Sequence, residues 1–150
     1  MERQQQLMAQ LTDLTNELVW INRLAMEKEL QGYKLNEIDL IEKIARIPNP
    51  NVTKLAAASY MTRGAISKLT KKMIEKGLIE NYQSPENKKE IYFRLTAAGD
   101  TLNRRHQKLH EEFAQRDAAA FATMTDEEFD TVFRFIGRYR EHLKHMLKDS

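Results

Sequence analysis

The segment from residue 51 to residue 79 restricts the fold more than any other part of the chain. It predicts two short helices joined by a tight turn, because Asn51 and Thr62 are residue types that cap the first turn of a helix. Helices that cross closely need a small side chain opposite a branched one, and Ala56 and Ile66 meet this need. The pattern therefore predicts a helix–turn–helix whose second helix lies at the surface.

A two-stranded hairpin is predicted directly after this pair of helices. Gly77 is placed to end the second helix, and residues 78–82 then turn to strand. Residues 84–90 are expected to form a polar turn. The alternation of apolar and polar side chains over residues 91–95 predicts the second strand.

Long helices flank this compact unit on both sides. Residues 3–31 predict one helix, because apolar residues recur at steps of three and four. Another long helix follows Thr96, and a last one begins at Thr125, which forms a capping box with Glu128. A long amphipathic helix must cover its apolar face, and a second chain can supply the cover. The stripe on the first helix consists of Leu7, Leu11, Leu14, Leu18, Ile21 and Ala25.

The predicted fold is mainly α-helical with one small β-hairpin, a winged helix-turn-helix in the order α-α-α-α-β-β-α-α. We expect a single domain over residues 1–150, with the winged helix-turn-helix unit at residues 36–96. Asn36 is expected to cap the first helix of that unit. The helical regions 1–32 and 97–150 are expected to form a homodimer.

The charged residues are unevenly distributed along the chain. The net charge is only +2, but nine basic and four acidic residues between Thr53 and Arg94 give that segment +5. The segments before and after it carry −2 and −1. A basic centre between mildly acidic arms is typical of a module that binds a polyanion, although a solvated charged face gives the same composition.

Several classes of protein are excluded by what the sequence lacks. The chain has no cysteine, which excludes disulfides, thiolate metal sites and thiol-based oxidant sensing, and which suits the cytoplasm. It has no apolar run of about 18 residues that would span a membrane, and its start lacks the pattern of a signal peptide. It also lacks a phosphate-binding glycine loop and a nucleophile elbow, so we expect neither an enzyme nor a cofactor.

The outward face of the second short helix carries residue types that bind double-stranded DNA. Arg63 stands in the first turn, where a guanidinium can reach guanine O6 and N7 in the major groove. Small neighbours permit close approach, and lysines further along suit phosphates. A winged helix used only for protein contacts is the alternative. The candidate residues are Thr53, Thr62, Arg63, Gly64, Ala65, Ser67, Lys68, Lys71 and Lys72 on the helices, and Asn87, Lys88 and Lys89 at the hairpin tip.

Over essentially its whole length the chain resembles the MarR (multiple antibiotic resistance regulator) family. The resemblance implies a transcription regulator, expected to be a repressor, that acts as an obligate dimer on a palindromic operator. It also implies a pocket for a small-molecule effector between the dimer helices and the DNA-binding unit. The matching motifs are Leu55-Ala56, T-x-x-x-I-S from Thr62 to Ser67, K-G-L-I from Lys76 to Ile79 and L-T-x-x-G from Leu95 to Gly99.

The chain departs from the family pattern in two places. Wings of the family usually carry an aspartate and an arginine two residues apart, where this chain has Asn87 and Lys89. An amide and an ammonium cannot form the same bidentate ion pair, so we expect this wing to bind backbone charge more than to read the minor groove. Tyr60 stands where the turn of a helix–turn–helix often has glycine, which predicts an unusual turn.

Two histidines are candidates for a metal site. His106 and His110 lie four residues apart on the fifth predicted helix, a spacing that lets two imidazoles share a metal ion. Glu111, Glu112 or Asp39 can complete such a site, and by resemblance some zinc-sensing relatives carry a histidine pair on this helix. Solvent-exposed histidines are the favoured interpretation, because basic residues surround the pair. A zinc-responsive regulator is the alternative.

Four large side chains are candidates for an effector pocket. Residues of this kind at helical spacing more often belong to a core or a dimer interface, which is the favoured interpretation here. The long helices alone would also suit a dimeric interaction protein that binds no DNA. The four candidates are Trp20, Met26, Tyr33 and Phe113.

Overall fold

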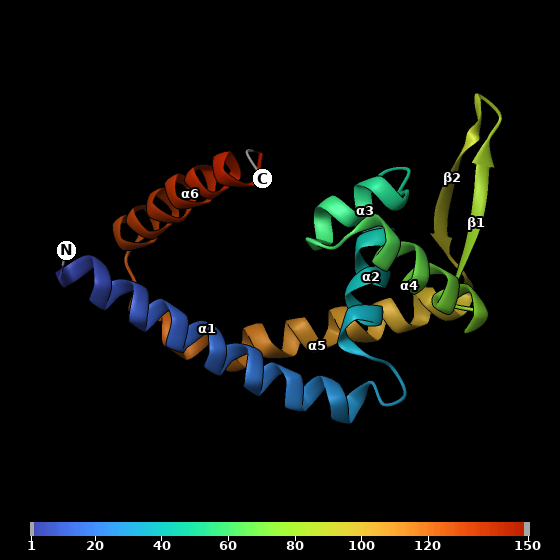
Figure 1. Cartoon of the computed structure of the whole chain (residues 1–150). Coiled ribbons are helices and arrows are strands. Elements are labelled where there is room, and N and C mark those ends of the chain that lie inside the picture. Colours follow the sequence, from blue (N-terminus) through green and yellow to red (C-terminus); the bar gives the residue numbers. More distant parts are fainter. Residues whose placement is uncertain (1, 149–150) are drawn as a thin grey trace. The chain divides into compact units, whose positions relative to one another are not determined.

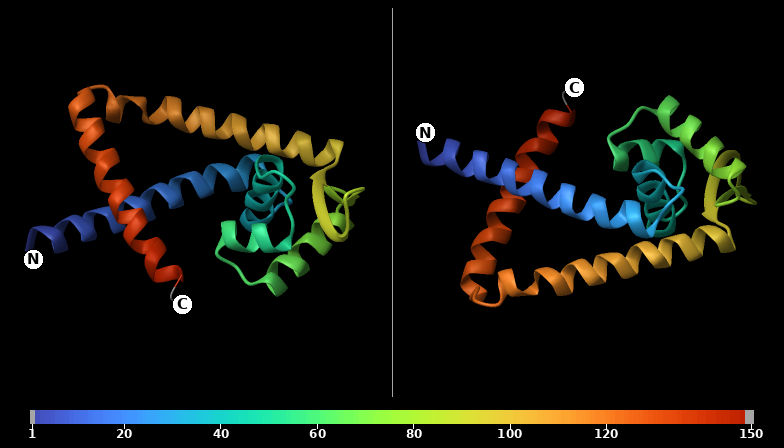
Figure 2. Two further views of the ribbon diagram at one scale, coloured as in Figure 1. Left: turned by 90° about the horizontal axis from the view of Figure 1, so that it is seen from above. Right: turned by 90° about the horizontal axis from the view of Figure 1, so that it is seen from below.

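The computed structural model describes residues 2–148 and contains two compact units, Met1–Glu112 and Phe113–Ser150 (Figures 1 and 2). The described chain has six helices and one two-stranded antiparallel sheet, which confirms the predicted fold class. None of these helices is both long enough and apolar enough to cross a membrane. The elements are α1 (Glu2–Glu29), α2 (Leu35–Arg46), α3 (Val52–Ser59), α4 (Arg63–Glu75), β1 (Ile79–Ser84), β2 (Asn87–Leu95), α5 (Ala97–Phe121) and α6 (Asp126–Lys148). The division into a winged unit at residues 36–96 and dimer helices on either side stays a prediction.

The core of the first unit lies where α2, α3, α4 and the β1–β2 hairpin meet. Each element contributes the apolar side chains of one face, and complete burial of one aliphatic side chain is worth about 1.5–3 kcal/mol. The core thereby fixes the orientation of α4 against the hairpin. Its most deeply buried members include Ile38, Ile41, Leu55, Ile66, Met73 and Ile79.

The helix ends around the turn follow the sequence prediction. The Asn51 side chain accepts a hydrogen bond from the Lys54 N–H at 2.8 Å, and the Thr62 hydroxyl accepts one from the Ala65 N–H at 3.1 Å. Gly77, with φ +74°, follows α4 in the left-handed conformation that commonly ends a helix. These contacts confirm the predicted caps of α3 and α4.

The start of α2 differs from the prediction. Asn36 does not cap the helix, because α2 begins at Leu35 and Lys34 occupies the N-cap position without a side-chain cap. The backbone N–H groups of Glu37 and Ile38 both donate to the Lys34 carbonyl at 3.1 Å, so the first turn closes two residues earlier than expected. Asn36 is an exposed residue inside the helix.

The hairpin is longer than the sequence indicates. β2 begins at Asn87, so the expected polar turn over residues 84–90 is reduced to Pro85 and Glu86. Ser84 pairs with Asn87, and the Gln83 side chain donates to the Lys88 carbonyl at 3.0 Å. These contacts carry the strand ladder through residues whose polarity is typical of a turn.

The second unit contains the end of α5 and the whole of α6. The Thr125 hydroxyl accepts from the Glu128 N–H at 3.2 Å, and the Thr125 N–H donates to Glu128 Oε1 at 3.3 Å. These reciprocal bonds confirm the predicted capping box. No residue of α6 is buried, and its Phe133 side chain is 64% exposed.

The start of α5 contacts the turn between α4 and β1 unusually closely. A Cβ atom on Gly99 would lie 2.0 Å from the Leu78 carbonyl oxygen, so only glycine fits there. The same carbonyl accepts from the Thr96 N–H at 3.1 Å, and the Thr96 hydroxyl donates to the Gly77 carbonyl at 2.6 Å. The first turn of α5 is therefore bonded directly to the end of the helix–turn–helix.

Tyr60 has a left-handed backbone conformation at the turn between α3 and α4. Its φ is +53° and its side chain is 80% exposed, so little packing offsets the steric cost that a Cβ atom adds in this conformation. Glycine has no Cβ and avoids that cost. The turn is built as the sequence suggested, with an uncommon residue in the usual place of glycine.

We expect the Tyr60→Gly variant to be more stable than Tyr60→Ala by about 1 kcal/mol, because alanine keeps the Cβ that the left-handed backbone disfavours. Both variants remove the phenol, so the comparison isolates the backbone effect. Urea unfolding followed by circular dichroism measures the difference. Equal free energies of unfolding would contradict a strained turn.

Candidate nucleic-acid interface

The first turn of α4 presents a polar surface to solvent. Thr62 ends the turn and caps the helix, and Arg63 and Gly64 follow as its first two residues, both exposed. Ala65 is half-buried, and nothing lies within 4 Å of the place where a Cβ on Gly64 would stand. The N-terminal end of the helix is thus open, with the Arg63 side chain in position to contact an external group.

The other predicted DNA-binding residues on the helices divide into two sets. Ser67, Lys68 and Lys71 are exposed on α4, and Thr53 is exposed on α3. Lys72 is different, because its ammonium lies 3.8 Å from Glu37 Oε1, and this intramolecular partner was not foreseen. Lys68 and Lys71 are therefore the lysines of α4 that face solvent most openly.

Glu37 is a buried carboxylate that joins α2 to the end of α4. The Lys76 ammonium donates to its two oxygens at 3.0 and 2.6 Å, and the Glu37 side chain is completely inaccessible to solvent. The Lys76 ammonium also lies 5.8 Å from the centre of the Tyr33 ring. A buried carboxylate needs such partners, since an unpaired one would be very costly. The pair therefore positions the C-terminal end of α4.

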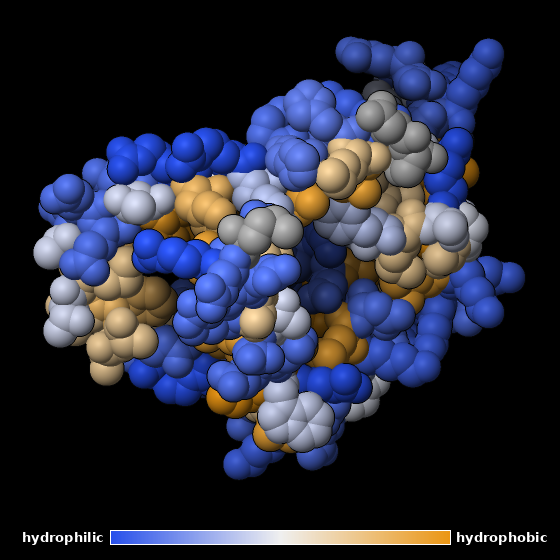
Figure 3. Space-filling view, turned by 60° about the vertical axis from the view of Figure 1, so that its left-hand side comes forward, coloured by the Kyte–Doolittle hydropathy of each residue, from blue (hydrophilic) through white to orange (hydrophobic). Residues whose placement is uncertain are grey.

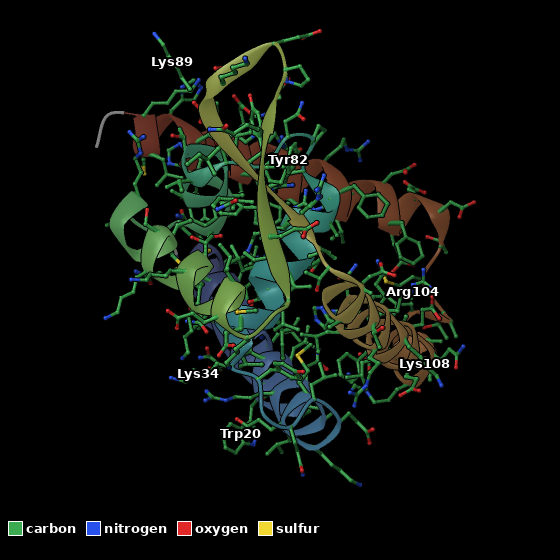
Figure 4. All side chains as sticks on the ribbon, turned by 90° about the vertical axis from the view of Figure 1, so that its right-hand side faces the viewer. Trp20, Lys34, Tyr82, Lys89, Arg104 and Lys108 are labelled. Atoms are coloured by element: carbon green, nitrogen blue, oxygen red, sulfur yellow. The ribbon has the colours of Figure 1, made fainter. Side chains whose placement is uncertain are left out.

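The wing places its lysines far from the core. Lys88 and Lys89 are exposed at the start of β2, and Figure 4 shows Lys89 near the tip of the hairpin, pointing away from the body. The Asn87 side chain accepts a hydrogen bond from the Lys89 N–H at 3.2 Å, so the amide binds the wing's own backbone. Tyr82 and Tyr92 pair across the strands with ring centres 5.5 Å apart and stiffen the hairpin.

The base of the wing is attached to the loop before α3. The Phe93 N–H donates to the Pro50 carbonyl at 2.9 Å, and the Asn51 amide donates to Glu90 at 2.8 Å. The Tyr82 hydroxyl lies 3.3 Å from the Asn49 side-chain oxygen. These bonds connect the hairpin to α3, so the wing and the helix–turn–helix form one surface.

The two candidate histidines lie together on α5, in different environments. The expectation of exposed histidines is wrong for His106, which is 1% exposed, whereas His110 is exposed. Burial, and next the neighbouring His110, lower the pKa of His106, while Glu42 and Asp39 act in the opposite direction. The burial of His106 thus favours the neutral form of its imidazole.

The carboxylate next to this pair is one that sequence spacing did not indicate. Glu42 Oε2, on α2, lies 4.0 Å from His106 Nδ1. Glu42, His106 and His110 bring potential ligand atoms within 4.8 Å of one another. The predicted third ligands were Glu111, Glu112 and Asp39, whereas the structure brings Glu42 of α2 to the histidines. Glu42 and His106 are 64 positions apart in the chain, so sequence spacing could not indicate that they meet.

The four candidate effector residues occupy dissimilar places. Trp20 is 60% exposed on α1 (Figure 4), and Met26 and Tyr33 are half-buried. Phe113 is buried, with the Arg116 guanidinium 4.8 Å from its ring centre. A cavity of about 170 Å³ in the first unit has a different lining: Glu29, Leu30, Arg105, Lys108, Leu109 and Glu112. An effector pocket made of the four candidates stays a prediction.

We expect Glu37→Gln to lower the free energy of unfolding by about 1–3 kcal/mol, because it weakens hydrogen bonds to a charged group. Glu80→Gln is the matched control, since Glu80 pairs with Arg94 at 2.7 Å but is 54% exposed. Exposed pairs contribute little, so this control should change stability by less than about 1 kcal/mol. Urea unfolding of both variants measures the two effects. Equal losses in the free energy of unfolding would show that the buried Glu37 pair contributes no more to stability than an exposed pair.

Comparison with known proteins extends the description of this surface. The MarR family's sequence model matches residues 34–91, which contain α2, α3, α4 and the wing tip. The chain is 33% identical over 94 residues to the uncharacterized HTH-type transcriptional regulator YhjH of Bacillus subtilis, covering 63% of this chain and 54% of that one. It is 28% identical over 102 residues to the regulator PchR of the same bacterium, covering 68% and 60%. The match thus spans little more than half the length of these two relatives.

Solved structures show the same fold. Streptococcus pneumoniae FabT in complex with DNA is similar with a TM-score of 0.80 and 18% identity, over 95% of this chain and 98% of that one. Staphylococcus aureus MarR in complex with salicylate and kanamycin is similar with a TM-score of 0.76 and 16% identity, over 97% and 95%. Both curated relatives are named as transcriptional regulators. The chain thus matches the MarR family's sequence model over its central segment and shares the fold of a solved MarR structure over nearly its whole length.

Proposed function

We propose that this chain is a sequence-specific DNA-binding regulator of the MarR family that represses transcription as a homodimer on a palindromic operator and responds to a small effector. The observation that carries the proposal is the open N-terminal turn of α4, with exposed Arg63, beside a wing tipped by exposed Lys88 and Lys89. FabT, which shares the fold, was solved in complex with DNA.

Base reading is assigned to the first turn of α4. The recognition helix of a helix–turn–helix contacts base edges with its N-terminal residues. Arg63 occupies that place, and a guanidinium can bind guanine O6 and N7 with two hydrogen bonds. The absence of a side chain on Gly64 leaves room for the groove wall. Arg63 is therefore the residue to which we assign sequence choice.

Phosphate binding is assigned to the exposed hydroxyl and ammonium groups around that turn. Lys68 and Lys71 extend from α4, and Lys88 and Lys89 extend from the wing. Such contacts fix orientation and add affinity without reading sequence, and they make binding depend on salt. Lys72 has a smaller part here, since its charge is shared with Glu37.

The homodimer is supported by apolar surface that the single chain leaves uncovered. No residue of α1 is buried, and its Leu14, Leu18 and Ile21 are 59%, 43% and 50% exposed. Apolar residues also reach the surface of α6, among them Phe133. Figure 3 shows such hydrophobic side chains at the surface between hydrophilic ones. A contiguous apolar stripe of this kind marks a protein interface, and a second copy brings an identical stripe.

Effector binding and repression are supported by relatives. Staphylococcus aureus MarR was solved with salicylate and kanamycin, and another structure of this fold is named an adhesin competence repressor. We propose that a small effector binds the chain and weakens DNA binding. The candidates remain Trp20, Met26, Tyr33 and Phe113.

Arg63→Ala should weaken binding to the preferred DNA by about 1–3 kcal/mol and relax the choice of base at one position of each half-site. Lys88→Ala and Lys89→Ala should weaken binding to all duplexes similarly. Each should also reduce the slope of log K against the logarithm of the salt concentration by about one. Lys34→Ala is the control, because Lys34 lies far from the wing tip in Figure 4 and should have no effect. Fluorescence anisotropy on selected and scrambled duplexes at several salt concentrations measures these changes. A uniform loss in Arg63→Ala would contradict base reading.

Genomic fragments selected by the chain should share a palindrome whose half-sites lie about one helical turn apart. The double variant Leu14→Glu/Leu18→Glu should be monomeric in light scattering and lose protection of the full site, because it buries like charges in the proposed interface. Asn16→Glu, on an exposed part of α1 away from the stripe, is the matched control. A dimer that survives the double variant would contradict the role of α1. An asymmetric single half-site would contradict the palindrome.

A further inference from the structure

Three side chains from two helices converge beside the winged unit. Glu42 comes from α2, and His106 and His110 come from successive turns of α5. One potential ligand atom from each lies within 4.8 Å of the other two. All three belong to the first compact unit, so the cluster depends on the packing of that unit alone.

The two imidazoles face each other through the same ring nitrogen. His106 Nε2 and His110 Nε2 are 2.8 Å apart, and the ring centres are 4.4 Å apart. Two lone pairs cannot stay so close without a proton or a cation between them. Around a tetrahedral zinc ion, with Zn–N distances near 2.0–2.1 Å, two ligand nitrogens stand roughly 3.3 Å apart. The exposed His110 ring needs to move by only about half an ångström to reach that spacing.

His106 is held at the site by burial. Its side chain is 1% exposed, and among the described residues Nδ1 has no hydrogen-bond partner. Glu42 Oε2 is the nearby carboxylate oxygen, 4.0 Å from that nitrogen. A buried polar atom without a partner is costly in a core. A small shift of the half-buried Glu42 side chain would complete a set of three ligands, since its carboxylate oxygen already lies within 4.8 Å of a nitrogen of each imidazole.

We propose that Glu42, His106 and His110 bind a zinc-like divalent cation. Two imidazole nitrogens and one carboxylate oxygen suit zinc, cobalt or nickel, whereas calcium and magnesium prefer oxygen ligands alone. Three protein ligands leave a fourth position for water or for another ligand. A hydrogen-bonded pair of neutral histidines, with no affinity for metal, is the alternative outcome.

Metal binding would join α2 to α5. Helix α2 also carries Glu37, whose carboxylate holds Lys76 at the end of α4. A cation at Glu42 therefore acts on the same helix that positions α4, five residues further along. The consequence that zinc changes DNA affinity rests on the proposed function, whereas the metal site itself does not.

The test is titration of the full, tag-free chain with Co²⁺ and then Zn²⁺, without DNA. We expect about one cobalt ion per chain with intense visible d–d bands, typical of four-coordinate geometry, and displacement of cobalt by zinc. His110→Ala and Glu42→Gln should each bind at least about tenfold more weakly. Both residues are at least partly exposed, so these variants are expected to fold. His145→Ala is the matched control, because it removes an exposed histidine that lies 3.7 Å from Glu141.

Absence of saturable binding, or unchanged affinity in His110→Ala and Glu42→Gln, would overturn the metal site. A second arm measures binding to the selected operator with and without zinc. A zinc effect that is present in the wild type and lost in Glu42→Gln supports regulation through this site. Zinc binding with unchanged operator affinity would overturn the regulatory consequence, and failure to select any operator would count against the proposed function alone.

Discussion

The pairing of the buried Glu37 carboxylate with Lys76 is the interaction on which the presentation of α4 depends. Removal of a carboxylate from water is costly, and its two hydrogen bonds at 3.0 and 2.6 Å offset that cost only in one relative position of α2 and α4. Apolar packing between helices is less directional than such a pair. The hydrophobic core thus brings the two helices together, and the ion pair selects the register at which the exposed face of α4 meets solvent.

The basic residues of the central segment consequently serve two purposes. Lys72 and Lys76 turn toward Glu37, whereas Lys68 and Lys71 remain exposed. The net charge of the segment therefore overstates the positive charge that an external polyanion can contact, because some of its lysines are paired within the chain. A similar division holds on the wing, where Arg94 pairs with Glu80 near the base and the lysines near the tip stay exposed.

Features that depend on neighbours in sequence were predictable, and features that depend on distant residues were not. The caps at Asn51, Thr62 and Thr125 followed from one side chain and a backbone N–H three residues away. The histidine pair followed from helical spacing in the same way. The roles of Glu37 and Glu42 were missed, because their partners lie 39 and 64 residues along the chain and no periodicity connects them. The family motifs indicated the winged fold, and they could not indicate which carboxylates it buries.

The missing side chain at Gly99 has a mechanical consequence. Because the Leu78 carbonyl occupies the space that a Cβ would take, the first turn of α5 cannot slide past the start of β1. A tilt of α5 around that contact is the movement that keeps this close approach intact. His106 stands seven residues further along, about 10 Å from this pivot. In such a tilt, a sideways displacement of α5 at His106 changes the angle between α5 and the root of the wing. The change in angle is larger when the distance from the contact to His106 is shorter.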